Sequence, residues 1–204
     1  MKSDLHEEGL STDFLALQKS QVAGLHKYPL VKRRVVQQSA KGRIVRMYCM
    51  MVVGDGNGLV GMGEAKAHDM ATCMQRAFML AVGNMDYVER FEGRTVWTDM
   101  ETKMGSTRIV LRPRPVGFGL RCNPNLHQVF QAAGIKDVSA KTWGSRNPIN
   151  VIKAAFRMLQ AGNAPLAMGD GVGGKGRKLN KGWGARSAGE IEMQRGRKLV
   201  SLRT

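Results

Sequence analysis

The sequence predicts an α+β fold, and three features indicate it. Two apolar runs, at residues 47–53 and 59–62, are joined by five residues rich in glycine, aspartate and asparagine. Such residues adopt positive φ angles at little cost, which is typical of the turn of a β-hairpin. An amphipathic helix is expected directly after the hairpin, at residues 69–88, and strands alternate with helices in the second half of the chain.

The region before the hairpin shows little periodicity apart from a possible short helix at residues 12–23. We expect residues 1–34 to form an N-terminal extension. Its first 17 residues contain four acids and no apolar central run, which does not fit a secretory signal or the acid-poor pattern of an uncleaved transit peptide. A first strand is expected to begin at Val35, with a turn at residues 39–43 before the long strand of the hairpin.

The helix after the hairpin is expected to cover one face of the sheet. Its apolar residues recur at helical spacing: Met70, Cys73, Ala77, Leu80, Ala81 and Met85. Asp69 directly precedes them and is a candidate N-cap. Beyond this helix, residues 95–97 form a possible short strand, and a domain boundary is expected near residues 87–94.

The second half is predicted to read β, α, β, α. Residues 107–112 alternate between apolar and basic, which indicates a half-buried strand with a cationic outer face. Asn-Pro pairs at 123–124 and 147–148 each open a helix, and glycines at 134 and 162 close them. A strand is expected between the helices, at residues 137–143, because Val138, Ala140 and Thr142 alternate with more polar residues.

The charge balance indicates a polyanionic partner. The 204 residues include 32 Lys and Arg against 16 Asp and Glu, giving a net charge of +16, with a sequence pI of about 10.3. Hydrophobic residues make up 43% of the chain, so it can form a core. A basic folded domain of this kind is typical of nucleic-acid binding. Membrane binding is disfavoured, since no apolar run approaches the roughly 20 residues of a span and no helix has a continuous basic face.

The C-terminal part, from residue 164, differs in composition from the rest. Residues 169–184 contain seven glycines, and residues 171–204 carry nine Lys or Arg against two Glu. Few large apolar residues are present, so this segment cannot bury enough surface to offset its chain entropy. We expect an extended arm that orders on a partner, with RNA as the first candidate.

Motifs for catalysis or cofactor binding are not convincing. Residues 56–61 match G-x-G-x-x-G, but a strand rather than a helix is expected after Gly58, so the dinucleotide interpretation is disfavoured. Residues 169–176 nearly match a phosphate-binding loop but lack its hydroxyl residue. The three cysteines are too scattered for a disulfide framework, and a metal ligand at Cys122 is the weaker alternative to a core thiol. The histidines show no metal-ligand spacing, so the sequence argues against an enzyme and predicts no cofactor.

Several separate segments resemble the small-subunit ribosomal protein S5 family. They are the run VVGDGNGLVG at 52–61, AKA at 65–67, RIVLRP at 108–113, AGIKDV at 133–138 and KTWGSRNPINV at 141–151. The resemblance covers roughly residues 35–160. The segments at 87–92 and 117–122 and the basic C-terminal extension resemble the mitochondrial branch of this family more than its bacterial members.

The resemblance implies a first domain similar to a double-stranded-RNA-binding domain at residues 35–90. It implies a second α/β domain with a left-handed crossover at residues 91–163, followed by the extension at 164–204. It also implies a structural protein of the mitochondrial ribosome in the matrix, which binds small-subunit rRNA and contacts proteins S4 and S8. Such a protein lines the mRNA entrance and supports decoding accuracy. The loop at residues 41–43 would contact RNA, and residues 112–119 would lie near protein S4. A free double-stranded-RNA-binding chaperone or enzyme subunit is the alternative.

The residues expected to contact RNA are mostly basic and lie in predicted turns, strand faces and the extension. Charges in the turn at 41–46 could equally be solvated surface groups, and the sequence does not decide between the two. The full candidate set is Lys41, Gly42, Arg43, Arg46, Asn57, Lys66, Arg108, Arg112, Arg114, Arg121, Lys175, Arg177, Lys178 and Lys181.

Overall fold

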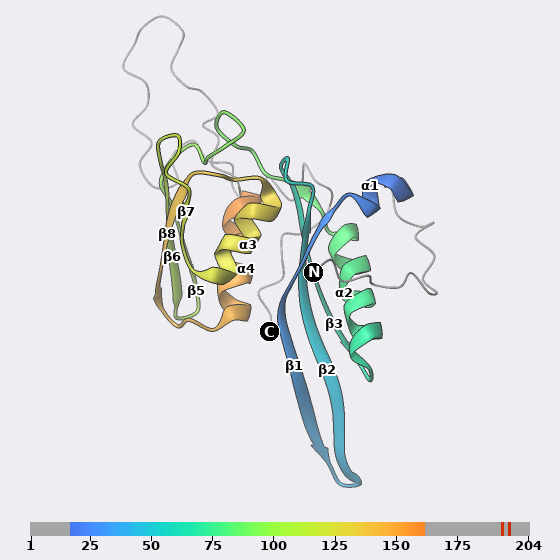
Figure 1. Cartoon of the computed structure of the whole chain (residues 1–204). Helices are drawn as coiled ribbons and strands as arrows, with labels where there is room; N and C mark the ends of the chain where they lie inside the picture. Colours follow the sequence, from blue (N-terminus) through green and yellow to red (C-terminus); the bar gives the residue numbers. More distant parts are fainter. Residues whose placement is uncertain (1–16, 162–192, 194–195, 197–204) are drawn as a thin grey trace, which may run out of the picture.

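The computed structural model describes residues 17–161, together with 193 and 196. These described residues form two four-stranded sheets and four helices. The order of the layers is visible in Figure 1: the second sheet, then helices α3 and α4, then the first sheet, then α2. Mixed α+β architecture is therefore confirmed.

The first sheet has the order β1-β2-β3-β4, and its neighbouring strands are antiparallel. Its strands are β1 (His26–Ser39), β2 (Gly42–Gly54), β3 (Leu59–Ala67) and β4 (Asp86–Tyr87). The predicted hairpin at 47–62 is confirmed and is longer than expected. The predicted start of the first strand at Val35 is wrong, because β1 begins at His26; its first part contains exposed cations and Pro29, which hide the alternation.

Helix α2 (Met70–Gly83) packs on one face of the first sheet. Asp69 caps it as predicted, since its carboxylate accepts a hydrogen bond of 3.1 Å from the Ala71 amide. The helix ends at Gly83, five residues before the predicted end, because the chain turns there to form β4. Close packing depends on Gly61 and Gly63 of β3, where a Cβ would overlap backbone oxygens of α2. Of the helix predicted at 12–23, the structure shows the short α1 (Lys19–Ala23), which begins after its N-cap Gln18, and residues 12–16 lie outside the described residues.

The second sheet has the order β5-β6-β8-β7. Its strands are β5 (Met100–Met104), β6 (Thr107–Pro113), β7 (Leu120–Arg121) and β8 (Val138–Gly144). The expected strand at 95–97 is wrong: Thr95 forms only an isolated bridge with Phe91, and the strand lies at β5 instead. The simple order β, α, β, α is also incomplete, since β5 and β7 are additional short strands with little hydrophobic pattern.

Helices α3 (Pro124–Ala133) and α4 (Pro148–Ala161) lie between the two sheets. Their N-caps are confirmed, with Asn123 accepting from the Asn125 amide and Asn147 from the Ile149 amide. Gly134 ends α3 with φ 74°; the predicted end at Gly162 lies outside the described residues. A single large core joins α3, α4 and facing residues of both sheets, including Phe130 and Phe156, which are fully buried.

One polar network crosses this core beside β2. The Lys153 ammonium lies 2.8 Å from Glu64 Oε1, and the Tyr48 hydroxyl donates to Glu64 Oε2 at 2.9 Å. Lys153 is almost completely buried, with 6% of its side chain exposed. A buried ammonium requires a paired carboxylate, so this network fixes α4 against the first sheet.

Candidate nucleic-acid interface

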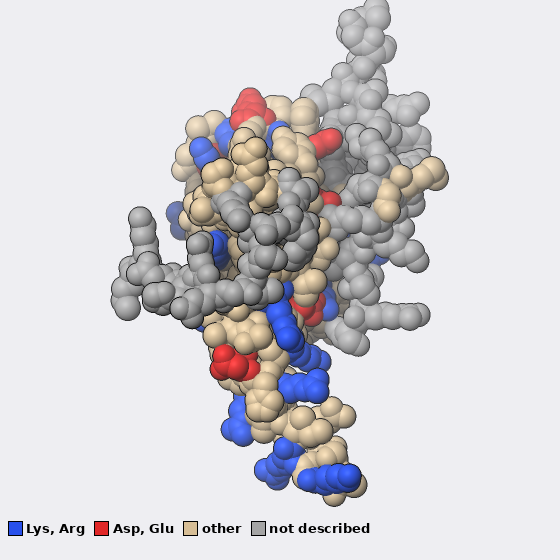
Figure 2. Space-filling model, turned by 90° about the vertical axis from the view of Figure 1, so that its right-hand side faces the viewer, with Lys and Arg blue, Asp and Glu red and all other residues tan. Residues whose placement is uncertain are grey.

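The first candidate surface is the projecting end of the β1–β2 hairpin, residues 32–46, called the arm here. Figures 1 and 2 show it extending away from the helices, with Lys and Arg side chains along it. It contains six Lys or Arg and no Asp or Glu. At about 3.3 Å per residue, β1 from Lys32 to Ser39 reaches roughly 20 Å. This is a narrow, strongly cationic projection.

The strand register places the cations of the arm on both of its faces. Arg34 and Arg43 lie on the face that continues into the α2 side of the sheet, whereas Arg33 and Arg46 lie on the opposite face. Lys41 is in the turn, where Gly42 has a φ of 118°. The described residues contain no ion pair that involves a side chain of the arm. Their charge is therefore available to a partner.

The β2–β3 turn at residues 55–58 does not resemble such an exposed loop. The Asp55 carboxylate accepts from the Asn57 and Leu59 amides, at 2.6 and 3.0 Å. The Gly56 amide donates to the Ala132 carbonyl at 3.0 Å, which joins the turn to α3. Asn57, a predicted RNA contact, accepts from the Arg90 guanidinium at 2.8 Å. The turn thus uses its polar groups within the protein.

Arg90 strengthens the junction between the β2–β3 turn of the first sheet and the end of α3. Its guanidinium also donates to the carbonyls of Gly134, at 2.9 Å, and Gly93, at 3.0 Å. Gly134 itself fits against Gly56 so closely that a Cβ would overlap the Gly56 carbonyl oxygen. The glycine pattern at residues 56–61 is therefore a close-packed turn followed by the strand β3. A dinucleotide-binding motif would need a helix there, so the sequence-based rejection of that interpretation is confirmed.

Lys66 lies at the root of the arm. It is exposed on β3 and is the register partner of Tyr48, so it shares the face of Arg33 and Arg46. The neighbouring Tyr48 side chain, unlike Lys66, is buried and donates a hydrogen bond to Glu64. Burial, the larger cause, and this hydrogen bond, the smaller cause, raise the pKa of Tyr48 above its ordinary value. Lys66 extends the cationic surface of the arm toward the body of the protein.

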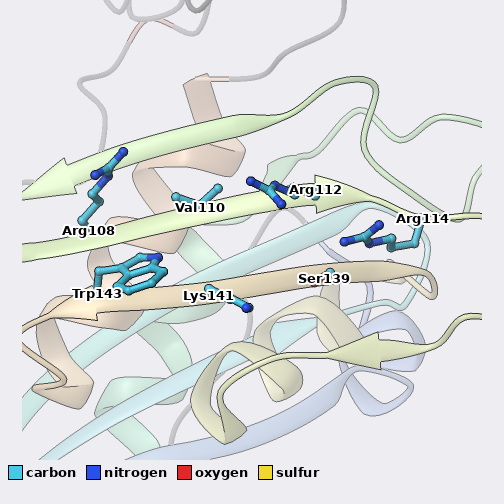
Figure 3. A pocket seen from close by; sticks show the side chains of 7 residues that line it. All are labelled: Arg108, Val110, Arg112, Arg114, Ser139, Lys141 and Trp143. Atoms are coloured by element: carbon cyan, nitrogen blue, oxygen red, sulfur yellow. The ribbon is translucent and has the colours of Figure 1, made fainter.

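The second candidate surface is the face of the second sheet that lies opposite α3 and α4, called the outer face. The inward residues of β6 and β8, such as Ile109 and Ala140, are buried, so their alternating neighbours project outward. Four predicted RNA contacts gather on or beside this face: Arg108, Arg112, Arg114 and Arg121. Figure 3 shows three of them around a shallow hollow.

Sequence reasoning missed two residues of the outer face. Lys141 and Trp143 are exposed and lie opposite Val110 and Arg108 on the neighbouring strand. The signal was present, because the alternation that marks Val138 and Ala140 as inward also places Lys141 and Trp143 outward.

Other predicted contacts lie outside the described residues. They are Lys175, Arg177, Lys178 and Lys181 of the extension. The candidate phosphate-binding loop at 169–176 lies there too. RNA contact by these four residues therefore stays a prediction from the sequence.

The cysteines within the described part of the chain are poor candidates for chemistry. Burial raises the pKa of Cys122 to about 11 and also raises the pKa of the Cys49 thiol, so both are protonated at neutral pH. Cys122 packs against the main core. No group of His, Cys, Asp and Glu that could hold a metal occurs among the described residues. None of the helices in residues 17–161 is long and apolar enough to cross a membrane.

Two family models match the chain. One describes the N-terminal domain of ribosomal protein S5 and covers residues 25–89, and the other describes its C-terminal domain and covers residues 102–169. Together they include both sheets and the helices between them.

Similar proteins come from fungi and bacteria. The chain is 44% identical over 164 residues to "Small ribosomal subunit protein uS5m" of Schizosaccharomyces pombe, covering 80% of this chain and 42% of that protein. For the protein of the same name from Neurospora crassa, the identity is 39%, covering 74% of this chain and 32% of the relative. "Small ribosomal subunit protein uS5" of Hahella chejuensis is 36% identical, covering 65% of this chain and 78% of the relative. The chain therefore spans less than half the length of these fungal relatives.

Proposed function

Because the chain belongs to the ribosomal protein S5 family, we propose that it is a structural, non-enzymatic component of a small ribosomal subunit that binds rRNA. Its location would be the mitochondrial matrix. The names and identities of the two fungal relatives support the mitochondrial assignment, since both exceed the identity to the bacterial protein.

The observation that carries this proposal is the arm. The arm is a narrow hairpin with six cations and no acid, and the strand register places the cations on both of its faces. A polyanion can therefore bind to either face of the arm. Phosphate neutralisation releases counterions and provides affinity without reading sequence. The deep major groove of RNA is closed to side chains, so recognition by shape and by phosphate contacts is expected. Lys41, Arg43 and Arg46 would contact phosphates, with Gly42 allowing the tight turn between them.

The fold supports a finer proposal for the first domain. A curved antiparallel sheet covered by α2 on one face is compatible with a double-stranded-RNA-binding-like domain. The parallel pair β7–β8, joined through α3, is the candidate left-handed crossover of the second domain. We place the start of the first domain at His26 rather than Val35, because β1 begins there. The boundary near residue 90 and the extension at 164–204 stay predictions.

Protein partners are proposed from the loop after β6. Val116 is 75% exposed and Phe118 is 38% exposed. Exposed apolar side chains next to a cationic sheet suit a protein neighbour better than phosphates. Residues 112–119 are thus the proposed region of contact with protein S4, as the family resemblance implies, with Val116 and Phe118 of the loop providing the contact and the sheet face left free. Contacts with protein S8 and with mRNA at its entrance, and an influence on decoding accuracy, belong to the same proposal.

Sedimentation tests the proposed function. The tagged chain is recovered from mitochondrial lysate on a sucrose gradient that contains magnesium and high salt. We expect quantitative recovery with the small subunit, near one copy per particle, because a resident protein is held by many contacts. Recovery mainly at the top of the gradient would contradict the proposal and favour a free double-stranded-RNA-binding protein.

A matched pair of variants makes this test specific to the arm. Lys41→Ala with Arg43→Ala removes two charges from the arm, and Arg76→Ala with Lys136→Ala removes two exposed charges from elsewhere. The first pair is expected to incorporate less well than the second. Equal incorporation of both pairs would remove the arm from the rRNA interface.

A further inference from the structure

The outer face of the second sheet carries a feature that phosphate binding alone does not require. A shallow hollow of about 320 Å³ lies over β6 and β8. Its lining includes four cations and one large aromatic side chain, Trp143, which is 58% exposed. A tryptophan of this exposure normally contributes buried area to a core or an interface. Its position on an otherwise polar strand face indicates a ligand that uses the flat surface of the indole.

The strand register fixes where the ring and the charges lie. Trp143 is opposite Arg108, and Lys141 is opposite Val110, which is the next pair on the same face, two residues further along each strand. Arg112 lies opposite Ser139 beyond them. In Figure 3 the indole lies beside Arg108 at one end of the hollow, Lys141 is central, and Arg112 and Arg114 are at the other end. An aromatic platform is therefore followed by a row of cations.

The cations differ in how far they are already neutralised. Arg108 donates to Glu101 at 2.6 Å, and this hydrogen bond raises the pKa of Arg108. Arg112 Nε lies 3.7 Å from Asp99 Oδ2, and both side chains are more than half exposed, so this ion pair is weak. Among the described residues, no ion pair involves Lys141 or Arg114. The Arg114 guanidinium lies over the Phe118 ring, 5.3 Å from its centroid, which orients it without neutralising its charge. Positive charge without a carboxylate partner among the described residues is thus concentrated beyond the indole, where a chain of phosphates could continue.

These features favour single-stranded RNA over other polyanions. In a duplex the bases are paired and stacked on one another, so none is available to the indole. A single strand presents unstacked bases to an aromatic ring and its phosphates to flanking cations. A protein partner would need an apolar centre, but only Val110 and Trp143 of the hollow's lining offer large apolar surface.

We propose that the outer face binds single-stranded RNA, with one base stacked on Trp143 and the following phosphates bound by Lys141, Arg112 and Arg114. The inference rests on the RNA-binding role proposed above and adds a second surface with a different preference. The arm would hold double-helical RNA, while the outer face would hold an unpaired segment.

Binding of a short unstructured oligouridine to the purified full chain tests the proposal. Trp143→Ala is expected to weaken this binding about tenfold, because a base can no longer stack on an aromatic ring there. Trp143→Tyr should restore most of the affinity, since the phenol ring still presents a flat face. Lys141→Gln should weaken binding and make it less dependent on salt. The exposed position of both side chains leaves the core intact, which a thermal melt of each variant checks.

Intrinsic fluorescence gives an independent measurement. The chain has three tryptophans, and Trp97→Phe with Trp183→Phe leaves Trp143 as the only one. Stacking predicts quenching of its emission by saturating oligouridine. Unchanged emission, or wild-type affinity of Trp143→Ala, would overturn the inference.

Two further results separate this inference from the proposed function. Trp143→Ala should bind a blunt RNA duplex as the wild type does, whereas Lys41→Ala with Arg43→Ala should weaken duplex binding. If Trp143→Ala sediments with the small subunit and binds oligouridine normally, the stacking site is wrong while the ribosomal assignment stands. A preference of the outer face for an acidic peptide over oligouridine would identify a protein site and also overturn the proposal.

Discussion

Two glycine-containing turns of the first sheet, at residues 39–42 and 54–59, have similar sequence signals and opposite roles. The arm turn points into solvent, and nothing lies within 4 Å of a Cβ placed at Gly42. In the β2–β3 turn, by contrast, Gly54 and Gly56 contact α3, and Asn57 is held by Arg90. The difference shows that a loop is available to RNA when its polar and charged groups lack partners inside the protein. Glycine content by itself does not distinguish the two cases.

The largest effect on stability is expected at the buried junction. Gly134→Ala introduces a Cβ that overlaps the Gly56 carbonyl oxygen, at a residue with φ 74°. Overpacking against backbone adds to the cost of the left-handed conformation, so we expect a loss of about 3 kcal/mol or more. Gly105→Ala is the matched control, because Gly105 has φ 56° and no atom within 4 Å of its Cβ position. It should lose only about 1 kcal/mol; equal losses in urea unfolding would contradict the packing argument.

A smaller loss is expected when the side-chain part of the junction is removed. Arg90→Met deletes hydrogen bonds to Asn57 and to the carbonyls of Gly93 and Gly134. Charge-assisted hydrogen bonds of this kind predict a loss of about 2 kcal/mol on chemical unfolding. Duplex RNA binding should be unchanged. Weaker RNA binding with unchanged stability would instead place Arg90 and Asn57 in the interface.

The root of the arm offers a test with pH. Because the pKa of Tyr48 is raised in the folded state by burial and by Glu64, its contribution to stability is complete below about pH 10, the ordinary value, and is lost as pH rises through the folded pKa. Tyr48→Phe should lower stability at neutral pH by about 1 kcal/mol. Above about pH 10 its stability should fall less steeply than that of the wild type; parallel alkaline curves would exclude this role.

The arm itself should show almost no effect on stability. Lys41→Ala with Arg43→Ala removes two exposed charges without an ion pair among the described residues. Its effect should appear in RNA binding, where the slope of log affinity against log salt becomes shallower by about 1.5 if both contact phosphates. An unchanged slope would mean that these charges are only solvated.

Much of the fold was predictable because it depends on local signals. Asn-Pro pairs and glycines fixed both ends of α3, and glycine with aspartate marked the β2–β3 turn. The short strands β5 and β7 were not predictable in the same way, since they are defined by pairing with β6 and β8. The early part of β1 was hidden because Pro29 and the register shift between Pro29 and Val31 interrupt the alternation of a regular strand.

The candidate site was predictable only as a set of separate residues, most of them basic. Sequence alone treats Lys41, Asn57 and Arg108 alike, although the structure places one on a free arm, one in an internal junction and one beside Glu101. Lys141 and Trp143 become candidates only when β8 is paired with β6 and their shared face is known. Side-chain partners across the fold therefore decide which charges can reach RNA.

Photo-crosslinking from the tip of the arm tests the central claim most directly. A photoreactive phenylalanine analogue replaces Ala40, which is exposed in the β1–β2 turn, and in a second variant it replaces Gln131, which is exposed on α3. Both proteins are incorporated into small subunits and irradiated. We expect the Ala40 position to crosslink to small-subunit rRNA far more than the Gln131 position does. Crosslinks from Ala40 to protein alone, or none in a fully occupied particle, would contradict the account.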